Sequence, residues 1–229
     1  MPTDSHVSLN DILAKGRNNM NKLVEIIIRW RMHQFAFHSD IQKMYNAVQL
    51  QDEHWCLQRY IWQDQLDPTL IPEEKVIKTL ICGDKPSGNQ AECGLRLTAE
   101  LSKGEYPHAN EIVQNDIYVD DCMSGESSQE LLFQRADELA LILCRGGFGL
   151  KGFTFSGKDP PPSLSEDGKS ISVGGMKWNS ISDELQLNIN QPDFLKRCRG
   201  KHTNAIREIP EKLTRSHRPH NSNYSVTKT

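Results

Sequence analysis

The segment from residue 127 to 147 constrains the fold most, because it carries the start, the buried face and the end of one helix. Ser127-Ser-Gln-Glu130 has the pattern of a capping box, in which serine and glutamate satisfy the first backbone amides of a helix. Leucine and alanine then recur at helical spacing until Gly146-Gly147 ends the pattern. The sequence therefore predicts an amphipathic helix here, followed by a strand over 148–155.

The other periodic segments predict alternating helices and strands. Apolar residues at helical spacing predict a helix over 19–31, and the alternating residues 35–40 predict a strand that ends on a carboxylate. A proline-free stretch predicts a helix over 88–103, and residues 112–123 predict two short strands that meet at Asp120-Asp121. The resulting order of strand, helix, two strands, helix and strand is a ferredoxin-like split βαβ plan. We therefore expect an α+β fold with an antiparallel sheet.

The C-terminal part of the chain combines one more pair of strands with a polar end. Residues 171–173 and 185–189 flank a Gly-rich turn and predict these two strands. From Arg197 onward there are too few apolar residues to bury a core, so we expect a disordered tail. The chain then divides into a helical lead-in, a central α+β domain and a basic tail, over residues 1–34, 35–190 and 191–229.

Charge and cysteine content limit where the protein acts. The formal net charge is −3, but residues 195–229 carry nine Lys or Arg against two Glu, which leaves the first 194 residues at about −10. Such a basic end either binds phosphate groups or is only a solvated extension. No apolar run approaches the ~20 residues needed to cross a bilayer, and the six cysteines lack disulfide or zinc spacing. We expect an intracellular protein, in the cytoplasm or the nucleus, that binds no membrane.

Three aspartates lie where predicted strands end. Asp120 and Asp121 are adjacent at a hairpin tip, and Asp40 ends another strand. Carboxylates brought together repel one another, and a divalent cation removes that repulsion. Two Mg²⁺ ions roughly 3.5–4 Å apart are also the means by which polymerases activate a hydroxyl and neutralise departing pyrophosphate. Because an acidic pair is equally common in solvated turns, these residues alone leave both interpretations open.

Five short segments form an ordered set of motifs along the chain. They are Val7-Ser-Leu-Asn-Asp-Ile-Leu13, Asp40-Ile-Gln-Lys-Met-Tyr45, Asp116-Ile-Tyr-Val-Asp-Asp121, Gly146-Gly-Phe148 and Gly175-Met-Lys-Trp178. From about Val7 to Thr214 the chain resembles the reverse transcriptase of BEL/Pao-type retrotransposons with long terminal repeats. The resemblance implies a polymerase palm, two Mg²⁺ ions with Mn²⁺ as a substitute, a primed RNA or DNA template, deoxynucleoside triphosphates, and further segments of a Pol polyprotein.

The resemblance also implies roles for individual residues. The metal ions would be held by Asp40, Ile41, Asp120 and Asp121, with Asp121 as a weaker ligand. Lys151 matches a region whose lysine is thought to protonate or brace the leaving pyrophosphate, although a solvated lysine is an equal alternative. The residues implied at the incoming nucleotide and template are Ile41, Tyr45, Ser87, Gly88, Gln90 and Tyr118. The residues implied in a primer-grip hairpin are Gly175, Met176, Lys177 and Trp178.

Several of these assignments have simpler alternatives. The ring of Tyr45 would exclude a 2′-hydroxyl by steric clash, but an isolated tyrosine here would also suit a core position. The glycine-rich stretch around Ser87 is just as compatible with an ordinary turn, and Trp178 with the packing of an ordinary hairpin.

Segments that the family places around its palm are not matched. Only 39 residues precede Asp40, and they hold no strand with the arginine that would grip a triphosphate. We therefore expect a palm without fingers and thumb, which is either an RNA-directed DNA polymerase segment or a truncated, inactive relic with residual nucleic-acid binding. A metal-dependent nuclease is a third class, but it would not require Tyr45 or the Gly-Gly-Phe segment.

Overall fold

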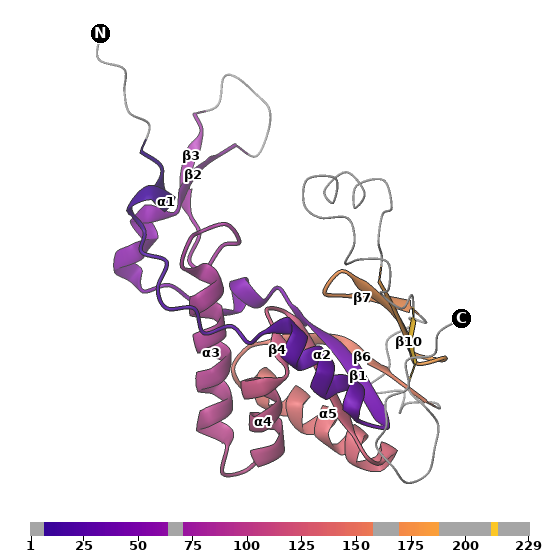
Figure 1. Ribbon diagram of the computed structural model, residues 1–229. Coiled ribbons are helices and arrows are strands. Elements are labelled where there is room, and N and C mark those ends of the chain that lie inside the picture. The colour runs from indigo at the N-terminus through magenta and orange to yellow at the C-terminus, as the bar shows by residue number, and fades with distance from the viewer. Residues whose placement is uncertain (1–6, 64–70, 158–169, 188–211, 215–229) are drawn as a thin grey trace, which may run out of the picture.

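A four-stranded antiparallel sheet forms the centre of the structure, a computed structural model that describes residues 7–63, 71–157, 170–187 and 212–214 (Figure 1). The strands lie in the order β4-β5-β1-β6 and comprise β1 (Phe35–Gln42), β4 (Ile117–Tyr118), β5 (Asp121–Glu126) and β6 (Gly149–Phe155). The chain passes through α3 (Ser87–Ser102) and α4 (Pro107–Asn115) between β1 and β4, and through α5 (Gln129–Arg145) between β5 and β6. Every neighbouring pair is antiparallel, as in a split βαβ unit. The expected α+β fold with an antiparallel sheet is confirmed.

Helix α4 replaces part of the strand pair expected over 112–123. Pro107 occupies the first turn, where its missing amide costs nothing, and Ala109, Ile112 and Val113 are buried at helical spacing. The hairpin is confined to β4 and β5, whose two-residue connection is Val119-Asp120. The expectation of strands was therefore wrong for residues 112–115, because the apolar side chains there face the helical layer.

Helix α5 is confirmed, but the expected capping box of Ser127 and Glu130 is not. The N-cap is Ser128 rather than Ser127, and its hydroxyl accepts a hydrogen bond from the Leu131 amide at 3.3 Å. The helix ends at Gly146, and Gly147 takes the left-handed conformation (φ +79°) that glycine adopts without strain. The buried face comprises Leu132, Ala136, Leu139, Ile142 and Leu143.

The three helices α3, α4 and α5 cover one face of the central sheet. Phe37 on β1 meets Phe153 and Phe155 on β6 edge-on, with ring centroids 5.1 and 6.1 Å apart. Burial of each such ring contributes roughly 1.5–3 kcal/mol. Side chains alternate between the two faces of a strand, and Phe37 on β1 points into the helical core. Asp40 lies three residues further along β1, so its carboxylate points to the opposite face of the sheet.

The opposite face is covered by helix α2 (Leu23–Met32) and by a second antiparallel sheet in the order β10-β9-β8-β7. Its strands are β7 (Ser170–Val173), β8 (Met176–Asn179), β9 (Glu184–Leu187) and β10 (Lys212–Thr214). The expected pair over 171–173 and 185–189 was incomplete, because β8 lies between these segments and pairs with both. Residues 188–189 and most of the expected tail lie outside the described residues, whereas β10 pairs with β9.

A third sheet lies beyond the central sheet (Figure 1). The hairpin of β2 (Arg59–Trp62) and β3 (Glu73–Val76) was not expected from the sequence. The short helices are α1 (Leu9–Ile12), η1 (Met44–Ala47) and η2 (Asp52–Leu57). Across the part of the chain that the structure describes, no helix combines the length and apolarity that a membrane span requires.

Candidate active site

The register of the central sheet brings the three aspartates together. Asp40 on β1 lies directly opposite Asp121, the first residue of β5. Asp120 occupies the turn before β5, and its carbonyl accepts a hydrogen bond of 2.7 Å from the Ile41 amide. The end of β1 is thus joined by a backbone hydrogen bond to the hairpin tip that carries the acidic pair.

The hairpin tip is strained at Val119. This residue has φ +57°, in the left-handed region that is costly for a β-branched side chain. A two-residue hairpin turn requires a positive φ at its first or at both central positions, which is the reason glycine or asparagine usually stands there. Strain of this kind persists only where surrounding structure imposes it, and it concentrates at functional sites.

The side chains of Lys151 and His38 contact two of the aspartates. Lys151 on β6 places its Nζ 2.9 Å from Oδ1 of Asp40. His38, two residues before Asp40 on the same face of β1, places Nε2 2.9 Å from Oδ1 of Asp121. His38 was not anticipated, although strand alternation relative to Asp40 could have indicated it.

Among the described residues, Asp120 forms no comparable contact with a basic side chain, and its environment disfavours the charged form of its carboxyl. Burial raises the pKa of its carboxyl, and the neighbouring Asp121 and Asp40 raise that pKa further. A hydrogen bond from its own backbone amide and the charge of Lys151 act in the opposite direction. The site therefore concentrates negative charge that is only partly neutralised.

The aspartates suit a hard divalent cation by donor type, because Mg²⁺ and Mn²⁺ prefer carboxylate oxygens. The repulsion that raises the pKa of Asp120 is the cost that such a cation would remove. Among the described residues, however, no group of three or more His, Cys, Asp or Glu side chains is arranged to hold a metal ion. The side chain of Ile41 is buried in the core, so this residue could reach an ion only through its backbone.

Tyr45 lies between the aspartates and the start of α3. A Cβ placed on Gly88 would lie 3.9 Å from the Tyr45 hydroxyl, which puts that hydroxyl against the first turn of the helix. Burial raises the pKa of Tyr45, and the charges of Cys82 and Asp120 add to this effect. The structure thus brings together Tyr45, Gly88 and Asp120, which lie far apart in the sequence.

Of the three other residues expected at the substrate, Ser87 is buried, Gln90 is exposed and Tyr118 packs beside α2. Ser87 is only 1 % exposed, and its hydroxyl has no hydrogen-bond partner. Gln90 is exposed on α3, and Tyr118 packs against the second core beside α2. Ser87 therefore needs a movement of its surroundings before it could touch a ligand.

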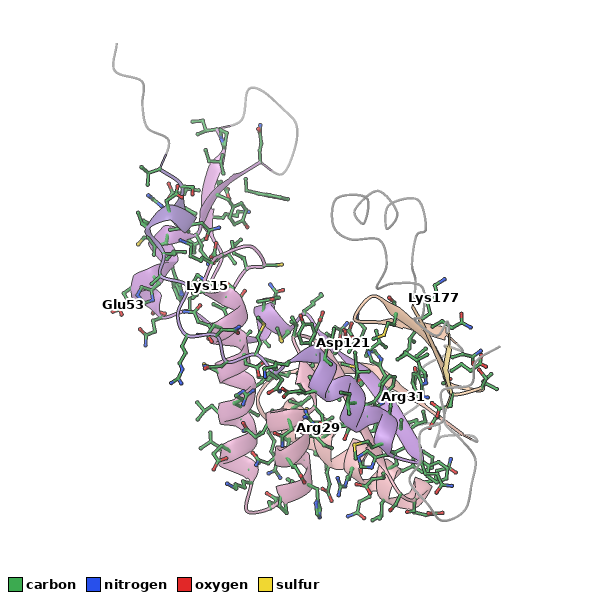
Figure 2. All side chains as sticks on the ribbon, in the orientation of Figure 1. Lys15, Arg29, Arg31, Glu53, Asp121 and Lys177 are labelled. Carbon is green, nitrogen blue, oxygen red and sulfur yellow. The ribbon has the colours of Figure 1, made fainter. Side chains whose placement is uncertain are left out.

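The expected primer-grip residues occupy the hairpin of β7 and β8. Gly175 has φ +85° in the turn, and Lys177 is exposed. Trp178 is fully buried, with its ring centroid 4.8 Å from that of Trp30 on α2. Figure 2 labels Lys177 on the C-terminal sheet and Asp121 on the central sheet. Met176, the remaining residue of this group, pairs with the end of β7 and is partly buried.

A buried ion pair attaches the turn between β8 and β9 to α2. Arg31 Nη1 lies 2.6 Å from Oδ1 of Asp183, and Nη2 donates to the Asp183 carbonyl at 2.8 Å. The indole of Trp178 donates to the same Oδ1 at 2.9 Å. Sequence reasoning missed this pair, because an arginine and an aspartate 152 residues apart carry no local signal.

Comparison with solved structures finds only a distant likeness for this chain. The chain matches no family model and no curated protein. Among solved structures it is similar to the foamy viral protease-reverse transcriptase in complex with RNA/DNA hybrid, at 13 % identity and a TM-score of 0.49. The match covers 77 % of this chain and 20 % of that one, so the chain spans about a fifth of its length. The assignment of the fold therefore rests on the strand order and pairing described above, and the BEL/Pao type has no support from these comparisons.

Proposed function

We propose that the chain is the palm segment of an RNA-directed DNA polymerase of the retrotransposon class, of the BEL/Pao type that its motifs resemble. The observation that carries the proposal is the meeting of Asp40, Asp120 and Asp121 at one end of a split βαβ sheet. Burial raises the pKa of Asp120, and Asp121 and Asp40 raise it further by repulsion; a bound cation would relieve this repulsion, which supports a site for a cationic ligand. The partners would be a primed RNA or DNA template and deoxynucleoside triphosphates.

In this proposal Asp40 and Asp120 hold two Mg²⁺ ions, with Asp121 as a weaker ligand and Ile41 contributing through its backbone. When bound, the ions would supply a lowered pKa for the primer 3′-hydroxyl and charge neutralisation for the departing pyrophosphate. Asp121 would keep its hydrogen bond to His38, which orients its carboxylate.

Lys151 would change partners during the reaction. It pairs with Asp40, so it occupies the position of a countercharge that a metal ion would replace. In the loaded site Lys151 would hold the departing pyrophosphate or donate a proton to it.

Tyr45 and the start of α3 would receive the sugar and base. The Tyr45 ring, held against Gly88, would leave no room for a 2′-hydroxyl, and selection of deoxynucleotides would follow from steric exclusion. Gln90 and Tyr118 would lie at the margins of the site, whereas the buried Ser87 would support the first turn of α3.

The hairpin of β7 and β8 would hold the primer end. Gly175, Met176 and Lys177 are the residues at its tip that would approach the primer backbone. Trp178 would act indirectly, because its ring is buried against α2.

A second candidate is an inactive relic that retains the fold and some affinity for nucleic acid. Two observations favour it: the aspartates do not form a ready-made group of metal ligands among the described residues, and Asp40 is already paired with Lys151.

Primer extension separates the two candidates. The purified chain is offered poly(rA) primed with oligo(dT), dTTP, and Mg²⁺ or Mn²⁺, beside Asp120→Asn. Asp137→Asn serves as the matched control, because Asp137 is exposed on α5, which covers the face of the central sheet opposite to that of Asp40. The polymerase proposal expects incorporation that Asp120→Asn abolishes and Asp137→Asn preserves. Equal incorporation by all three proteins, or none by the wild type, would refute it.

A further inference from the structure

The motif Val7-Ser-Leu-Asn-Asp-Ile-Leu13 has no part in the chemistry described so far, yet the structure holds it in a defined place. It forms α1, and a capping box closes this single turn: the Ser8 amide and hydroxyl both donate to Oδ2 of Asp11, each at 2.8 Å. These hydrogen bonds lower the pKa of the Asp11 carboxyl, and the charge of Lys85 lowers it slightly further. Asn10 lies inside this capped turn.

The side-chain amide of Asn10 spans the loop that precedes α3. Its Nδ2 donates to the Gly83 carbonyl at 2.8 Å, and its Oδ1 accepts from the Lys85 amide at 2.7 Å. One planar amide thus supplies a donor and an acceptor to residues two apart, which is the pattern that a neighbouring strand would provide. The loop needs such support, because Gly83 has φ +116° and its residues belong to no helix or strand.

This loop determines where α3 begins. The Ser87 amide donates to the Asp84 carbonyl at 3.1 Å, and the next residue, Gly88, stands against the Tyr45 hydroxyl. On its other side the loop is held by Gln58, whose Nε2 donates to Oδ2 of Asp84 at 2.7 Å. A displacement of the loop would therefore change the gap between α3 and Tyr45.

We infer that Asn10 is a positioning residue: it fixes the loop from Gly83 to Lys85 and thereby sets the space between Gly88 and Tyr45 that an incoming sugar would enter. Asn10 touches neither substrate nor the aspartates, and it acts only through backbone atoms of the loop. The functional half of the inference, control of sugar selection, rests on the proposed polymerase function.

Amide exchange tests whether Asn10 holds the loop. In Asn10→Ala we expect the Lys85 amide, followed by NMR, to lose protection by roughly 5- to 150-fold, the factor for two lost hydrogen bonds. Asn18→Ala is the matched control, because Asn18 lies in the same lead-in and its side-chain oxygen accepts a local hydrogen bond from the Met20 amide. Unchanged protection of Lys85 in Asn10→Ala would overturn the inference.

Global unfolding is separated from the local effect by the amides of α5, which should keep their protection in Asn10→Ala. If the amides of α5 also lose protection, the variant Asn10→Asp tests the local role of Asn10, since it keeps the acceptor for Lys85 and removes the donor to Gly83. Wild-type protection of all amides of the loop in Asn10→Asp would count against a role of Asn10 in holding the loop.

Sugar selection tests the functional half. The ratio of dTTP to UTP incorporation on primed poly(rA) should fall several-fold in Asn10→Ala and stay unchanged in Asn18→Ala. A loosened loop with wild-type discrimination would overturn this half. A wild-type chain that incorporates neither nucleotide would refute the polymerase function, while the exchange data would still decide whether Asn10 holds the loop.

Discussion

The buried ion pair between Arg31 and Asp183 gives the sharpest prediction about stability. Their side chains are only 8 % and 12 % exposed, and Asp183 also accepts from the Trp178 indole. Asp183→Ala would leave the Arg31 guanidinium in the interior without its countercharge and Trp178 without its acceptor. Because this contact joins the second sheet to α2, its loss should loosen the β7–β8 hairpin.

The expected cost follows from burial. Removing one member of a buried ion pair costs about 3–5 kcal/mol, since the remaining charge is uncompensated. The lost acceptor for Trp178 is part of the same network and is not added separately. Asp183 also has φ +51°, where alanine is disfavoured by roughly 1–2 kcal/mol. Asp183→Asn isolates the charge, because asparagine tolerates this conformation and keeps an oxygen acceptor for Trp178.

Urea unfolding followed by tryptophan fluorescence measures these differences, with the slope of the transition checked for equality among variants. We expect Asp183→Ala to lose about 4–7 kcal/mol and Asp183→Asn distinctly less. The control is Glu25→Ala, which breaks an exposed pair with Lys22 and should leave the free energy of unfolding close to that of the wild type. A loss below about 1 kcal/mol in Asp183→Ala would refute the buried pair.

Three further predictions concern packing, pH and the candidate site. Gly125→Ala should lower stability by about 1–3 kcal/mol, because a Cβ there would lie 2.7 Å from a backbone carbonyl, whereas Gly104→Ala, in open space, should not; equal melting temperatures would contradict this. The guanidinium of Arg145 lowers the pKa of Glu105 from 4.5 to about 2. The stabilisation from this pair is therefore complete above pH 4.5 and is lost as the pH falls toward 2. Glu105→Gln should flatten that part of the profile of stability against pH, and an unchanged profile would argue against the pairing. Lys151→Ala should tighten Mg²⁺ binding measured by calorimetry, since the competing countercharge at the end of β1 is removed; weaker binding would oppose that account.

Local signals predicted most of the central domain. The cap, apolar face and glycine end of α5 all lie within one continuous segment, so their meaning does not depend on distant residues. The alternation that predicted β1 is equally local. The same reasoning failed over 112–115, where Ile112 and Val113 suit a strand or a buried helix and only the neighbouring helices decide between them.

The candidate site could be predicted from the sequence only in part. The sequence placed Asp40 and the acidic pair at strand ends, and ordered motifs suggested that they work together. The register that sets Asp40 opposite Asp121, however, is a property of the assembled sheet.

The sequence by itself determined β1, α3, α5 and β6, the buried face of α5 and the three aspartates of the candidate site. Tertiary structure alone decided the partners: His38 with Asp121, Arg31 with Asp183, and Asn10 with the loop before α3. The physical reason is the separation along the chain over which each interaction acts. Periodicity and capping act over a few residues. These ion pairs and side-chain hydrogen bonds, in contrast, form between segments that only the complete packing brings within 3 Å.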